Sequence, residues 1–138
     1  MSGNEPVLPD PIVLTRLDHL VLAVDDLDRT QDLYVDVLGV TPVRSPDGRR
    51  ALSFGQSKIN LHHIGAEIAP HAVKPLAGTA DFCLVTELTA AEVLRRLEAL
   101  RVHKELGPVA RQGAQGAMTS VYVRDPDGNL VEVATYAG

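Results

Sequence analysis

The sequence of 138 residues is poor in cysteine and in aromatic residues. Its single cysteine, Cys83, excludes a disulfide framework and a cysteine-based zinc site, and its position in an apolar run predicts a buried, unreactive thiol. No stretch approaches the roughly 20 apolar residues that a membrane span needs, and no basic-then-apolar signal pattern opens the sequence. We therefore expect no membrane association and a cytoplasmic protein.

Positive charge is also scarce. The formal net charge is −5 at pH 7, and no cluster of lysine and arginine is interleaved with aromatic residues, which argues against a nucleic-acid partner. An apolar fraction of 45% is ordinary for a globular protein, and the length suits a single domain over residues 1–138.

What the sequence does contain is a histidine inside an otherwise apolar strand. Residues 17–24, LDHLVLAV, alternate with period two, so His19 shares a strand face with Leu17, Val21 and Ala23. Such a histidine is either hydrogen-bonded within a core or a metal ligand. The strand alone leaves both interpretations open.

The order of predicted elements repeats along the chain. A strand, a helix and three strands occupy about residues 16–64, and the same apolar pattern returns over about residues 79–136. The second copy is longer, and we assign its extra residues to a loop in the glycine-rich segment 107–117. The predicted fold is α+β, with two tandem βαβββ modules forming one curved, mixed sheet of eight strands around a metal cavity.

The repeat places four polar residues at matched positions of apolar strands. Alignment of the halves sets His19 over Asp81 and Asn60 over Glu132, and His62 lies on the same strand face as Asn60. Each polar side chain would cost about 1–3 kcal/mol if it were buried without a partner. A divalent cation shared by the imidazole and the carboxylates removes that cost, so the pattern predicts a metal site.

Two segments carry a resemblance to a known family. LDHLVLAVDDLDRTQDLYVDVLGV (residues 17–40) and RDPDGNLVEV (residues 124–133) resemble the opening and closing motifs of the vicinal oxygen chelate superfamily. Its members include glyoxalase I, bleomycin-resistance proteins and extradiol dioxygenases. FGQSKINLH and GTADFCLVTE are most similar to a subgroup of glyoxalase-domain proteins that have no assigned reaction.

The resemblance implies a ligand set for one divalent metal ion, which we expect to be Mn, Fe, Ni, Mg or Zn. His19 and Glu132 match the superfamily's ligand pattern. Asp81 occupies a ligand position that glyoxalases and dioxygenases usually fill with histidine, and Asn60 stands where glyoxalase I has Glu or Gln. A further contact to the metal comes from Asn60 or from His62. The resemblance also implies a homodimer, since superfamily members with this number of modules usually associate.

The residues separate three candidate activities. Glyoxalase-like isomerisation uses metal-ligating carboxylates as bases; Glu132 can serve, but the amide of Asn60 does not accept a proton near neutral pH. Extradiol cleavage needs Fe(II) with two histidines and one carboxylate, which requires His62 in place of Asn60. A non-catalytic protein that sequesters a drug, as bleomycin-resistance proteins do, usually relies on aromatic residues and lacks the metal ligands.

We therefore expect a divalent-metal-dependent lyase, isomerase or dioxygenase that chelates a small substrate through two vicinal oxygens. The metal acts as a Lewis acid, and Glu132 and His62 are the candidate catalytic residues. Asn60, Arg111 and Tyr122 are candidate substrate contacts. Arg111 is expected in a loop that either covers the cavity or is simply exposed. Tyr122 either presents its hydroxyl to the cavity or packs half-buried.

Overall fold

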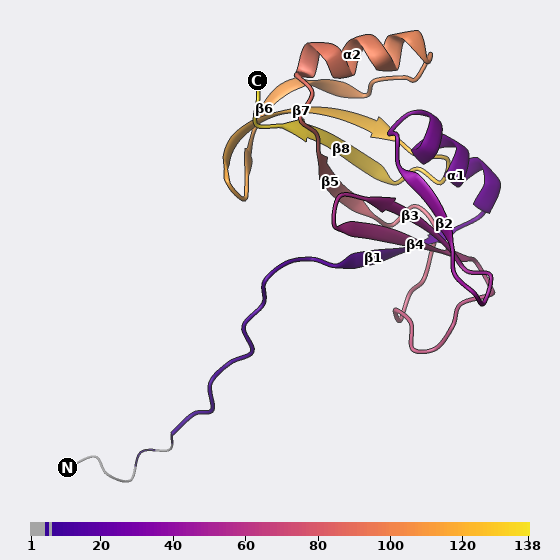
Figure 1. Ribbon diagram of the computed structural model, residues 1–138, viewed down its shortest axis with the longest axis vertical. Helices are drawn as coiled ribbons and strands as arrows, with labels where there is room; N and C mark the ends of the chain where they lie inside the picture. Colours follow the sequence, from indigo (N-terminus) through magenta and orange to yellow (C-terminus); the bar gives the residue numbers. More distant parts are fainter. Residues whose placement is uncertain (1–4, 6) are drawn as a thin grey trace.

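The described residues of the computed structural model, residue 5 and residues 7–138, form eight strands and two helices (Figure 1). The predicted domain also includes residues 1–4 and 6, which lie outside the described residues. The first half contains β1 (His19–Val24), α1 (Leu27–Asp36), β2 (Thr41–Arg44), β3 (Arg50–Phe54) and β4 (Ser57–His63). The second half contains β5 (Asp81–Val85), α2 (Ala90–Ala99), β6 (Leu106–Gly113), β7 (Gly116–Arg124) and β8 (Leu130–Thr135).

The α+β class and the tandem βαβββ order are confirmed. The strands of the described chain divide into two four-stranded sheets, with orders β1-β4-β3-β2 and β5-β8-β7-β6, where the sequence predicted one sheet of eight. In each sheet the first and last strands of the module pair in parallel and the other neighbours are antiparallel. Because β1 and β5 each stand at the end of a sheet, both have a free edge.

The strand register reproduces the predicted equivalence of the two halves. Val21 pairs with Asn60 in the first sheet, and Cys83 pairs with Glu132 in the second. His19 and Asp81 each lie two residues before these pairs on the same strand face. The four polar residues therefore occupy corresponding places in the two sheets.

The helices determine which face of each sheet is buried. Asp26 caps α1 by accepting a hydrogen bond from the Arg29 N–H at 3.0 Å, and Thr89 caps α2 in the same way through Glu92 at 3.2 Å. Alternate side chains of the inner strands join the helices in one apolar core, which includes Leu22, Val24, Tyr34, Leu52, Ile59, Leu97, Val121, Val123 and Val131. The other face of each sheet, which carries the polar residues, is called here the open face.

The segment 107–117 is not the predicted loop. Most of it belongs to β6, which pairs with β7 and continues to Gly113, and only two residues separate Gly113 from Gly116, where β7 begins. A register shift between Leu106 and Val109 accommodates Gly107 and Pro108, residues that suggest a loop in the sequence but are tolerated at a bulge in an edge strand. The extra length of the second half lies in longer β6 and β7 strands and in the turn before β8.

Gly107 is required where it stands, which gives a stability prediction. Its φ is +119°, and a Cβ there would lie 2.5 Å from the Ser120 carbonyl oxygen and 2.9 Å from Val121 Cα. Backbone strain and the clash together are expected to lower the unfolding free energy of Gly107→Ala by about 2–4 kcal/mol, measured by urea denaturation. Gly116→Ala is the matched control, because its φ is +125° and nothing lies within 4 Å of its Cβ position. An equal decrease in unfolding free energy in both variants would show that the clash with Ser120 and Val121 does not contribute.

Two further features of the fold concern its helices and the segment before β1. In the part of the chain described, neither helix has the length and apolar character needed to cross a bilayer. Residues 7–15 run away from the body as an extended segment (Figure 1), and they expose Val7, Leu8, Ile12, Val13 and Leu14.

Candidate functional site

On the open face of the first sheet, the ring of His19 is held by its neighbour in the chain. The His19 Nδ1–H donates to Asp18 Oδ2 at 2.8 Å, and this bond, with the nearby Arg16 guanidinium, lowers the pKa of the Asp18 carboxyl below its usual value. A carboxylate on Nδ1 fixes the tautomer in which Nε2 carries the lone pair. His19 is 43% exposed in its side chain, so this nitrogen is available to a ligand.

Asn60 and His62 follow on β4, on the same face. Asn60 lies diagonally across from His19, about 8 Å away from backbone spacing alone, and both Asn60 and His62 are half-buried. His62 pairs with Ala23, so it lies four residues further along the sheet than the position beside His19. His63 is exposed on the opposite face.

On the open face of the second sheet, Glu132 is half-buried with one oxygen already bonded. The buried Ser120 hydroxyl donates to Glu132 Oε2 at 2.6 Å, which orients the carboxylate and leaves its other oxygen unused by that bond. Asp81 is exposed on β5, again about 8 Å diagonally from Glu132. The second sheet thus carries a carboxylate pair where the first carries His19 and Asn60.

Cys83 lies next to Glu132 and corrects the prediction of a buried thiol. It is exposed, because β5 is an edge strand and Cys83 points from its open face. Partial burial and the neighbouring Glu132 charge raise the pKa of the thiol to about 11, so it is protonated at neutral pH. The raised pKa favours an unreactive thiol for an electrostatic reason, and low reactivity of Cys83 stays a prediction.

Arg111 and Tyr122 complete this face. The Arg111 Nε–H donates to the Tyr122 hydroxyl at 2.9 Å, and the guanidinium carbon lies 5.5 Å from the centre of the tyrosine ring. Arg111 lies in β6, so it is not part of a covering loop. Tyr122 is half-buried and pairs with Glu132 across the sheet, which brings a cation and a phenol hydroxyl beside the carboxylate.

The two polar groups do not meet within one chain. Among the described residues, no three His, Cys, Asp or Glu side chains lie close enough together to hold a metal ion. The physical reason is the division into two sheets: His19 belongs to one open face, and Asp81 and Glu132 belong to the other. The donors themselves suit a divalent cation, because an imidazole nitrogen and a carboxylate, each oriented by a hydrogen bond, are both ligands that such ions accept.

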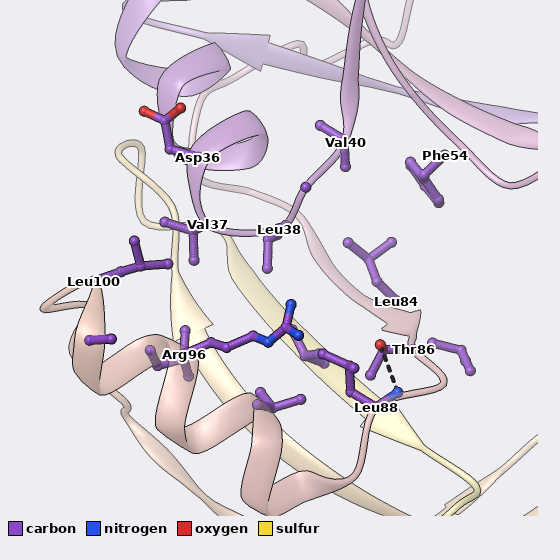
Figure 2. A pocket seen from close by; sticks show the side chains of 16 residues that line it. Asp36, Val37, Leu38, Val40, Phe54, Leu84, Thr86, Leu88, Arg96 and Leu100 are labelled. Carbon is purple, nitrogen blue, oxygen red and sulfur yellow. Dashed lines mark hydrogen bonds between the residues drawn. The ribbon is translucent and has the colours of Figure 1, made fainter.

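An apolar cavity lies away from these residues, and no pattern in the sequence predicted it. It has a volume of about 570 Å³ and lies between the end of α1, the end of β5 and one side of α2 (Figure 2). Its wall is mostly apolar, and Figure 2 shows the Arg96 side chain extending across it. None of the predicted site residues lines it. Such a cavity arises from how helix ends meet, which periodicity along one element does not predict.

Comparison with known proteins decides the family. The family model of the Glyoxalase/Bleomycin resistance protein/Dioxygenase superfamily matches residues 16–133. The chain belongs to this superfamily. Its superfamily relatives include the virulence protein STM3117 of Salmonella typhimurium, 42% identical over 91% of this chain and 87% of that protein. The glyoxalase domain-containing protein RDO1 of Mycosarcoma maydis is 44% identical over 87% of this chain and 68% of that protein.

Solved structures of superfamily relatives share the fold closely. The crystal structure of STM3117 superposes with a TM-score of 0.89 over 91% of this chain and 99% of that chain. The structure VPC_CASS1, from the mobile metagenome of V. Pseudocholerae, is 46% identical with a TM-score of 0.90 over 94% of this chain and 100% of that chain. The resemblance to glyoxalase-domain proteins read from the sequence is therefore confirmed.

Proposed function

We propose that this protein is a divalent-metal-dependent enzyme that acts on a small substrate held through two vicinal oxygens. His19, Asp81 and Glu132 are its metal ligands. The observation that carries the proposal is that two of these ligands are already oriented by hydrogen bonds. Asp18 orients the His19 ring at 2.8 Å, and Ser120 orients the Glu132 carboxylate at 2.6 Å. Residues with only a packing role would not need this second layer of hydrogen bonds.

Two copies of the chain complete the site. His19 and Glu132 lie on separate sheets, and β1 and β5 each have a free edge. Val21, 48% exposed, and Val85, 62% exposed, lie on the open faces of those edge strands. A twofold dimer in which β1 of one copy meets β5 of the other covers both valines and joins His19 to the carboxylates of the partner.

The residues around this site suggest how the chain handles a substrate. A bound metal supplies Lewis acidity to the substrate oxygens. Glu132 is the candidate base, since its carboxylate accepts a proton where the amide of Asn60 does not. Arg111 and Tyr122 offer N–H and O–H donors beside Glu132 that can orient the oxygens of the substrate.

The strand register favours an isomerase or lyase over an extradiol dioxygenase. The dioxygenase ligand set needs a second histidine, and His62 is the candidate. His62 lies four residues beyond the position beside His19, about 13 Å along the sheet, and strand side chains stand roughly perpendicular to it. Both rings would have to lie about 2.1 Å from one ion. His62 is therefore proposed as a substrate contact.

Metal content tests the proposal against a metal-free sequestering protein. After loading with Mn²⁺ or Ni²⁺ and gel filtration, the wild-type chain is expected to retain about one ion, and His19→Ala and Glu132→Gln less than about a tenth of that. His63→Ala and Glu98→Gln are matched controls, since both residues are exposed away from the open faces. Circular dichroism checks that the variants are folded. A wild-type protein that retains no metal would sink the proposal.

A further inference from the structure

The segment that connects the modules, residues 64–80, builds a small cavity against the first sheet. It has a volume of about 150 Å³ and lies over the open face near the ends of β1 and β4. Its floor is formed by Val21 and Ala23 of β1 and by His62 of β4. The connector supplies the rest of the wall, including His71 and Lys74.

The charged side chains that line this cavity are of one sign. Lys74 carries a positive charge, and His62 and His71 add imidazole rings that acquire one on protonation. No Asp or Glu is among the described residues that line it. In a chain whose net charge is −5, this makes the cavity a place where an anion can gain from every ionisable side chain of the lining.

The hydrogen bonds of the connector keep these donors free. The His71 Nδ1–H donates to the carbonyl of Ala72 at 2.8 Å, so on the protonated ring the Nε2–H is the donor that is left for an anion. The connector is closed at its far end by the Thr79 hydroxyl, which donates to the Leu76 carbonyl at 3.0 Å.

Glu67, a carboxylate on which His62 and His71 act, is held to the backbone. The side chain of Glu67 accepts from the Gly65 N–H at 3.0 Å. This backbone hydrogen bond lowers the pKa of Glu67, and the nearby His71 and His62 lower it further. The two imidazoles therefore lie near enough to a carboxylate to stabilise its negative charge, which is the interaction that an anionic ligand would use.

We propose that this cavity binds an anionic oxygen group of the substrate, a carboxylate or a phosphate, through His62, His71 and Lys74. The inference rests on the proposed function, because it assigns this group to the substrate of the same open face. Val21 lies two residues from His19, so the anionic group binds about 7 Å or more from the proposed metal. A volume of about 150 Å³ holds a carboxylate with a few carbon atoms, being about five times the volume of a water molecule.

Binding of small probes to the metal-free protein tests the cavity without the metal site. The C2–H proton signals of His62 and His71 are followed by NMR during titration with butyrate, with butyramide as the uncharged isostere, and with inorganic phosphate. We expect butyrate or phosphate to shift both signals with a saturable, millimolar dissociation constant, and butyramide to leave them unchanged. Tighter binding of phosphate assigns a phosphate ester, and tighter binding of butyrate assigns a carboxylate.

A pair of charge-matched variants makes the test specific. His71→Gln with Lys74→Ala is expected to weaken anion binding, read at His62, by at least about tenfold. His103→Gln with Lys104→Ala removes the same residue types from the exposed segment between α2 and β6 and should leave binding unchanged.

The outcomes separate this inference from the proposed function. Equal weakening in the two double variants, equal binding of butyramide, or no shift up to about 100 mM anion overturns the cavity assignment. A protein that binds butyrate through His71 and Lys74 but retains no metal keeps the anion site and loses the metalloenzyme. A protein that retains metal but binds neither butyrate nor phosphate keeps the proposed metalloenzyme and loses the anion site.

Discussion

A mixture of His19→Ala and Glu132→Gln chains is expected to recover about one quarter of the wild-type metal content, although neither variant alone retains metal. The reason is the position of the ligands on separate sheets. In a twofold dimer each site takes His19 from one copy and Glu132 from the other. Half of randomly paired dimers are mixed, and one of the two sites in a mixed dimer is intact.

The measurement is metal analysis after the two variants are unfolded together, refolded and reloaded, with dimer mass checked by light scattering. A mixture of Asp81→Asn and Glu132→Gln is the control. These residues lie on the same sheet, so every site in a mixed dimer lacks one of them and no recovery is expected. Recovery in the control mixture, no recovery in the test mixture, or a monomeric mass at micromolar concentration would each contradict the shared site.

Asp125→Ala is expected to lower the unfolding free energy by about 3–5 kcal/mol, which is a large effect for a single side chain. Asp125 is 5% exposed and lies at the turn between β7 and β8. Its carboxylate accepts from the Tyr34 hydroxyl at 2.9 Å, from the Asn129 amide at 2.8 Å, and from the Asp127 and Asn129 N–H groups at 3.0 Å each. Removing it leaves all of these buried donors without their acceptor.

This cluster also joins the two halves of the chain, because Tyr34 belongs to α1. Burial and the adjacent Asp125 charge raise the pKa of Tyr34 far above its usual value, so the phenol stays protonated and keeps donating. Tyr34→Phe removes one donor, leaves the others bonded, and should cost about 1 kcal/mol. Urea denaturation measures both variants. An Asp125→Ala protein within about 1 kcal/mol of the wild type would show that water replaces the carboxylate.

Sequence patterns predicted those parts of the fold that depend on a single element or on the repeat. The equivalence of His19 with Asp81 and of Asn60 with Glu132 was predictable, because period-two alternation fixes strand faces and a shared register follows from the repeat. The position of β6 was missed because the glycines and the proline of segment 107–117 suggest a loop, and their acceptance at a bulge depends on the partner strand.

The candidate site was predictable as a list of donors and not as an arrangement. Whether two strands of matching modules meet within a chain or between chains depends on sheet packing, which local patterns do not encode. The path of the connector over β4 could not be predicted either. Its prolines indicate a turn-rich segment, but they do not determine which face of the sheet it covers. The pairing of Asp18 with His19 is a contact between neighbours in sequence, and their adjacency could have suggested it.

The separation of His19 from Glu132 on two sheets has a consequence for how the protein responds to its own abundance. When a ligand binds only the assembled pair, its affinity and the association of the chains are linked by mass action, and each strengthens the other to the same extent. Dilution of the protein would therefore release metal, and metal added to dilute protein would drive chains together. In a cell, the fraction of loaded sites would rise more steeply than the amount of protein made.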